Sequence, residues 1–132
     1  MFAMATPKQH FLNVDLDLES TRRLAEVLEA LEPHVFVLSS TPRRASVELA
    51  KQPRTAEEAV RRFTRLVQQF GVKGKKAWQQ CSKRVLNIGL QAGESPRQLV
   101  VPLSAQVVRE ASRASLGLAF TVYSPIALRA RR

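Results

Sequence analysis

The stretch from Thr55 to Gly71 constrains the fold most, because the sequence marks its start, its buried face and its end. Thr55 and Glu58 have the spacing of a capping box, in which the two residues bond to each other's backbone at a helix start. Gly71 predicts a left-handed helix stop. Between them the apolar residues recur at helical spacing and form one stripe: Ala56, Ala59, Val60, Phe63, Leu66, Val67 and Phe70. We expect this stripe to pack on a sheet.

Six other stretches predict strands. Apolar and polar residues alternate in four of them, as in strands with one solvated face: Phe11–Ser20, Ala45–Ala50, Arg84–Gln91 and Leu116–Tyr123. Val35–Leu38 lacks polar alternation. It predicts either a strand covered on both faces or an edge strand that only resembles one. Gln98–Leu103 predicts an edge strand, because Pro102 cannot donate to a ladder. The alternation places one set of side chains in the core beside the helix stripe, namely Leu12, Leu16, Leu86, Ile88 and Phe120.

Three more helices complete the predicted order. Ser20 or Thr21 is expected to cap a helix that ends before Pro33, and Ser104 to cap a last helix that carries Val107, Val108 and Ala111. A minor helix at Val72–Ser82 turns Trp78 and Cys81 inward. The prediction is an α+β fold: a mostly antiparallel or mixed sheet of about six strands with helices on one face, in the order βαββα(α)ββαβ. We expect a loose leader at 1–9, one domain at 10–126 and a basic tail at 127–132.

Two stretches, Asn87–Gly93 and Phe120–Pro125, resemble segments of a family of short uncharacterised bacterial proteins. The resemblance implies no activity, cofactor or site residue. The order of the first six elements also resembles the ferredoxin-like split βαβ unit.

Charge is spread unevenly along the 132 residues. The formal net charge is +10, yet residues 1 to 32 hold three basic and six acidic groups, so the excess of Lys and Arg belongs to the later part. A basic chain favours acidic partners or nucleic acid. Cys81 is the only cysteine, which excludes an internal disulfide and favours a cytoplasmic location. His10, His34 and Cys81 match no zinc spacing, and residues 1 to 10 form neither a signal peptide nor a membrane span, so we expect no metal, cofactor or membrane partner.

The sheet face away from the helices is the first candidate surface. Its polar residues are Asn13, Asp15, Asp17, Ser46, Glu48, Asn87, Gln91, Thr121 and Tyr123. Paired carboxylates such as Asp15 and Asp17 could serve acid/base chemistry or hold a cation, although solvated strands carry such residues without any function. No Ser, His and acid set stands in a recognisable catalytic context, so the sequence favours a non-catalytic role.

The second candidate surface is a basic patch composed of Arg43, Arg44, Arg61, Arg62, Arg65, Lys73, Lys75 and Lys76. Clustered on one side, these residues would contact phosphates with salt-sensitive affinity. The expected sheet face offers only Tyr123 for base stacking. We therefore expect association with a protein partner or with itself, through the open sheet face or an edge strand. Nucleic-acid binding through the basic patch is the alternative, and an enzyme or ligand-binding protein using Asp15, Asp17 or Glu48 comes third.

Overall fold

The computed structural model describes residues 8–125, which form one mixed sheet of five strands with four helices. The strands are β1 His10–Ser20, β2 Val35–Thr41, β3 Arg44–Leu49, β4 Cys81–Gln91 and β5 Gly117–Tyr123. The helices are α1 Ala25–Leu31, α2 Ala56–Gln68, α3 Val72–Gln79 and α4 Ala105–Arg113. The α+β class is therefore confirmed. The expected tail and most of the expected leader lie outside the described residues, and Lys8 forms an isolated bridge with Ser95.

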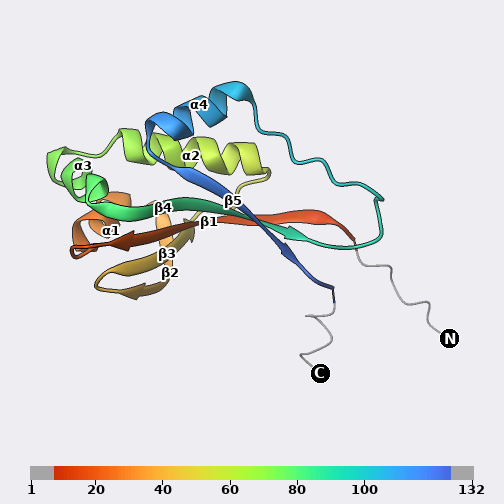
Figure 1. Cartoon of the computed structure of the whole chain (residues 1–132), viewed down its shortest axis with the longest axis horizontal. Coiled ribbons are helices and arrows are strands. Elements are labelled where there is room, and N and C mark those ends of the chain that lie inside the picture. Colours follow the sequence, from red (N-terminus) through yellow and green to blue (C-terminus); the bar gives the residue numbers. More distant parts are fainter. Residues whose placement is uncertain (1–7, 126–132) are drawn as a thin grey trace.

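The strands lie in the order β2-β3-β1-β4-β5 (Figure 1). β1 pairs antiparallel with both β3 and β4, β2 pairs antiparallel with β3, and β5 runs parallel to β4. β3 thus lies between β1 and β2, which is the interleaving of a split βαβ unit. β2 and β5 form the two edges of the sheet.

The predicted sixth strand at Gln98–Leu103 is wrong. This segment runs between β4 and α4 and joins no ladder. Val101 and Leu103 nevertheless pack against the core. The segment therefore turns alternate side chains toward the core although it has no neighbouring strand to pair with, and its apolar composition does not show that it is a strand.

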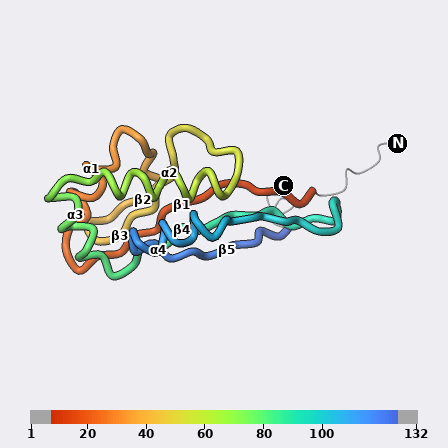
Figure 2. The backbone as a smooth tube through the Cα atoms, turned by 90° about the horizontal axis from the view of Figure 1, so that it is seen from above, coloured from red at the N-terminus to blue at the C-terminus, as the bar shows by residue number. Residues whose placement is uncertain are grey.

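The helices leave one sheet face open. α1 and α3 lie side by side at one end of the sheet, while α2 and α4 lie over its middle (Figures 1 and 2). The apolar stripe of α2 faces the sheet as expected: Phe63 is fully buried, and so are Leu16, Leu86 and Ile88. Leu66 is partly buried against the same core.

The Thr55 cap at the start of α2 is as predicted, but the second bond of the capping box and the end of the helix are not. Thr55 Oγ1 accepts a hydrogen bond from the Glu58 backbone N–H at 3.1 Å. The Glu58 carboxylate accepts from the Arg54 N–H at 3.0 Å, one residue earlier than a capping box requires. Gly71 has a φ of −71°, so the left-handed stop is wrong. α3 follows at once, and Gly71 is its N-cap.

The predicted cap of α1 is also wrong. Ser20 ends β1, Leu24 is the N-cap, and no side chain caps this helix. α3 ends at Gln79, so Cys81 begins β4 and does not belong to the helix expected at Val72–Ser82. Trp78 and Cys81 are both buried as expected.

The cap of α4 is confirmed, because Ser104 Oγ accepts from the Val107 N–H at 3.1 Å. Val107 and Ala111 are buried. Val108, which was expected to face inward with them, is 42% exposed.

Two of the side chains that alternation assigns to the core, Leu12 and Phe120, are not buried there. A register shift between Phe11 and Asn13 pairs Phe11 with Leu90, so Phe11 takes the core-facing place that the alternation gives to Leu12. Phe120 pairs with Ile88 on the helix side, but 53% of it is exposed. β5 is an edge strand. The C-terminal ends of β4 and β5 extend beyond the helices, so no helix covers this end of the sheet (Figures 1 and 2).

Candidate functional site

The open sheet face carries a cavity of about 250 Å³ to which all five strands contribute. Alternation along the strands turns the lining side chains away from the helices. They are Leu12, Asn13, Asp15, Leu38, Glu48, Asn87, Gly89 and Tyr123. The structure therefore brings together five of the nine residues expected on this surface, whereas Asp17, Ser46, Gln91 and Thr121 do not line the cavity.

Hydrogen bonds order most of the polar groups on this face. Asn13 Nδ2 donates to Glu48 Oε2 at 3.0 Å, which joins β1 to β3. Thr121 Oγ1 donates to Asn87 Oδ1 at 2.7 Å, which joins β5 to β4. Beside the cavity, Ser46 Oγ donates to Asp17 Oδ1 at 2.9 Å, and Gln91 Nε2 donates to the Tyr123 carbonyl at 3.2 Å. These amide and carboxylate groups are thus held in place across the strands.

Asp15 differs from its neighbours. Its side chain makes no hydrogen bond or ion pair with any residue between 8 and 125. Partial burial raises the pKa of Asp15, and the negative charges of Asp17 and Glu48 raise it further. The arrangement can accept hydrogen bonds or hold a positive charge. Within the described part of the chain, no group of three or more His, Cys, Asp or Glu side chains is placed to hold a metal ion.

Two apolar side chains of β2 stand beside this cavity, and sequence reasoning did not assign them to it. Leu38 lines the cavity, and Phe36 pairs with Glu48, which also lines it. Phe36 is 58% exposed and Leu38 is 50% exposed. A run of four apolar residues does not reveal which of them face solvent, because that depends on the place of the strand in the sheet. Phe36 and Leu38 together are called the β2 rim below.

β2 is an edge strand. It pairs with β3 on one side, and its other side pairs with no strand of the described chain. Val35 is buried, but Val37 is 41% exposed between the two residues of the β2 rim. No residue from Val35 to Thr41 is charged. Natural edge strands are ordinarily protected by charged residues, by proline or by bulges, and here only a register shift between Val37 and Ser39 interrupts the strand.

The eight residues of the proposed basic patch are divided among separate places. Arg44 Nε forms an ion pair with Glu19 Oε1 at 3.2 Å, near the C-terminal end of β1. On α2, Arg61 pairs with Glu57 at 3.1 Å, and Arg62 pairs with Glu58 at 3.7 Å. These ion pairs lie within one helix face and reduce the charge available to a partner.

Four of the eight basic side chains line two cavities, whereas Arg43 and Lys75 line neither of them. Arg62 and Arg65 contribute to one, together with His34, Leu49, Lys51 and Leu66. Lys73 and Lys76 contribute to the other, where Arg22 and Arg23 join them. Sequence reasoning missed Arg22 and Arg23, because they belong to the acidic first part of the chain.

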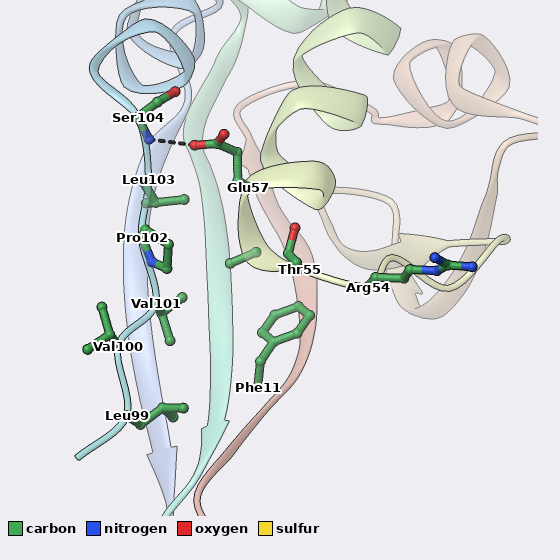
Figure 3. A pocket seen from close by; sticks show the side chains of 11 residues that line it. Phe11, Arg54, Thr55, Glu57, Leu99, Val100, Val101, Pro102, Leu103 and Ser104 are labelled. Atoms are coloured by element: carbon green, nitrogen blue, oxygen red, sulfur yellow. Dashed lines mark hydrogen bonds between the residues drawn. The ribbon is translucent and has the colours of Figure 1, made fainter.

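A fourth cavity, of about 460 Å³, lies beside the segment that was expected to be a strand (Figure 3). Apolar side chains of residues 99–103 line it together with Phe11 of β1. At its polar end, the Glu57 carboxylate accepts a hydrogen bond from the Ser104 N–H (Figure 3). The hydrogen bonds from Ser104 lower the pKa of Glu57. This bond joins the starts of α2 and α4, so Glu57 has a structural role here.

Trp78 and Cys81 belong to the core. Trp78 Nε1 donates to the Ala114 carbonyl at 2.9 Å, and its ring meets Phe70 edge to face. Burial raises the pKa of the Cys81 thiol. Arg84 donates to the carbonyls of Trp78 and Cys81 at 2.9 and 2.8 Å. Trp78 and Cys81 are therefore buried, and their hydrogen bonds and ring contacts are with other residues of the core region.

The chain was compared with protein-family models, curated proteins and solved structures. Neither a family model, nor a curated protein, nor a solved structure matches the chain. The resemblance to short bacterial proteins stays a prediction. None of the four helices is both long and apolar enough to cross a membrane, as far as the described residues go.

Proposed function

We propose that this chain is a non-catalytic association domain that pairs with a second copy of itself along β2. One observation carries the proposal: Phe36, Val37 and Leu38 are 58%, 41% and 50% exposed on an edge strand that has no charged residue. Exposed apolar edge strands offer backbone N–H and C=O groups to another strand. The proposed compartment is the cytoplasm, since the single cysteine is free and buried.

Strand pairing would bury the exposed side chains in matching positions. Two antiparallel β2 strands related by a two-fold axis would bring the β2 rims of both copies together on the open face. Val37 pairs with the buried Val47, so the two Val37 side chains would meet on the helix side. The register shift after Val37 divides β2. We therefore assign the pairing to the apolar half, Val35 to Leu38.

Charge limits the contact to an uncharged surface, and closure then favours β2. Copies that carry +10 repel each other, so a stable contact needs a surface that adds no further like charge. β2 meets this condition. β5, the other edge, is also uncharged and exposes Val122 at 63%. Pairing of β2 with β5 would be heterologous and would extend without limit, whereas β2 with β2 closes at two copies.

Sedimentation equilibrium between about 1 and 100 µM tests the proposal. We expect the unmodified protein to form a dimer that dissociates on dilution. The double variant Phe36→Lys/Leu38→Lys should be monomeric throughout, because like charges would face each other across the pair. A matched control, Val72→Lys/Val100→Lys, adds the same charge at side chains that are 86% and 70% exposed, and it should still form dimers.

Three results would contradict the proposal. A monomer at every concentration would exclude self-pairing in this range. Equal dissociation of both double variants would attribute the effect to net charge instead of β2. Species that grow beyond two copies would favour the heterologous contact through β5.

A further inference from the structure

The cavity between α1 and α3 is lined by basic residues from two distant parts of the sequence. Its volume is about 530 Å³. The charged residues that line it are Arg22, Arg23, Glu26, Lys73 and Lys76. Four cations and one carboxylate give it a formal charge of +3. Arg22, Arg23, Lys73 and Lys76 are called the cationic cleft below.

Backbone packing brings the two pairs of cations together. Arg22 and Arg23 lie between β1 and α1, and Lys73 and Lys76 are one turn apart on α3. α3 approaches α1 at Gly74, where a Cβ atom would stand 3.1 Å from the Ala30 Cβ. Glycine therefore permits a helix contact that a side chain would hinder. Figure 1 shows the two helices adjacent at this end of the sheet.

The four cations are free to act on a ligand. None of their side chains makes a hydrogen bond or ion pair with another residue in the range 8–125. All four residues are exposed. By contrast, Arg61 and Arg62 on α2 are held by glutamates of their own helix. Unpaired like charges around one cavity repel one another, and a polyvalent anion would relieve that repulsion.

We propose that the cationic cleft binds a small ligand that carries several phosphate groups. Arginine guanidinium groups form paired hydrogen bonds with phosphate oxygens, and lysine ammonium groups add point charges. The volume falls within the range of small-molecule sites. No aromatic side chain lines the cleft, so a nucleobase has nothing to stack on. Recognition therefore acts on the phosphate chain and needs more than one phosphate to match the charge.

Calorimetric titration with inorganic tripolyphosphate at about 0.15 M salt tests this assignment. ATP, AMP and sulfate serve as comparison ligands. We expect tripolyphosphate and ATP to bind at least about tenfold more tightly than sulfate and AMP, because charge pairing grows with the number of phosphates. Similar affinities for tripolyphosphate and ATP would identify the phosphate chain as the recognised group, and much tighter binding of ATP would overturn that conclusion.

Two double variants with the same loss of charge locate the site. Arg23→Gln/Lys76→Gln removes one cation from each side of the cleft and should weaken tripolyphosphate binding at least about tenfold. Arg109→Gln/Arg113→Gln removes two exposed cations from α4 and should change it less than about twofold. Urea unfolding curves that match the unmodified protein will show that both variants are folded.

Several outcomes would overturn the proposal. One is no tripolyphosphate binding below about 1 mM. A second is equal weakening by both variants, which would show that net charge alone attracts the anion. A third is a single-stranded oligonucleotide that binds more tightly than tripolyphosphate and depends on the same two cleft residues, because the cleft would then be part of a nucleic-acid surface.

Discussion

Asp15 places a carboxyl group on the open sheet face where burial and two neighbouring carboxylates all oppose its ionisation. Its pKa in the folded protein is above the ordinary value of 3.8, so the folded state keeps this proton to a higher pH than the unfolded state does. The free energy of unfolding should therefore fall as the pH rises from 3.8 through the raised pKa, and the penalty remains at neutral pH. Asp15→Asn removes this penalty. We expect the variant to be more stable than the unmodified protein at pH 7, with a difference that shrinks as the pH falls through that window.

Urea titrations at several pH values check this expectation. Glu94→Gln, a change of an exposed carboxylate in the loop after β4, is the control and should leave the pH dependence unaltered. If Asp15→Asn is less stable than the unmodified protein at pH 7, the ionised carboxylate stabilises the folded state and the expectation is wrong.

Single residues could be placed on the correct face of the sheet wherever the ladder is regular. Asn13, Asp15 and Glu48 were assigned to the open face from alternation alone, and they line one cavity there. Leu12 was misplaced because a bulge reverses alternation and leaves no mark in the residue types. Phe120 faces the expected side and is still half exposed, since alternation gives the direction of a side chain and not the cover above it.

The start of α2 is capped by the side chain of Thr55. Thr55 satisfies the backbone N–H of Glu58, which would otherwise have no partner within the helix. Thr55→Ala should lower the free energy of unfolding by about 1 kcal/mol in a urea titration. Thr55→Ser keeps the accepting oxygen and should cost clearly less. Equal losses in the two variants would show that the methyl group, and not the hydrogen bond, is what matters.

Elements with local signals were predicted better than elements defined by their neighbours. The cap and stripe of α2 lie within one stretch of sequence, and that helix was found with its buried face. The edge position of β2 and the absence of a strand at 98–103 depend on pairing between distant segments. Apolar runs of similar composition occur in both covered and exposed strands, so residue types do not decide between them.

Charge along the chain did not predict charge on the folded molecule. The first 32 residues have a negative sum, but Arg22 and Arg23 from this part complete the cationic cleft with two lysines of α3. The proposed basic patch was divided instead, partly through ion pairs within α2. The ion pairs have a local signal in the four-residue spacing of Glu57 from Arg61 and of Glu58 from Arg62. The cleft instead follows from the packing of α3 against α1, which no local sequence signal contains.

At the scale of the whole molecule, the central claim is that two copies continue one sheet through β2. Amide hydrogen exchange followed by mass spectrometry at about 100 µM and at about 1 µM measures this most directly. We expect peptides that cover residues 35–41 to exchange faster after dilution, because their outer N–H groups lose the partner strand, while peptides from β1 and β4 exchange equally at both concentrations. Exchange in residues 35–41 that does not change with concentration, and equals that of Phe36→Lys/Leu38→Lys, would contradict the claim.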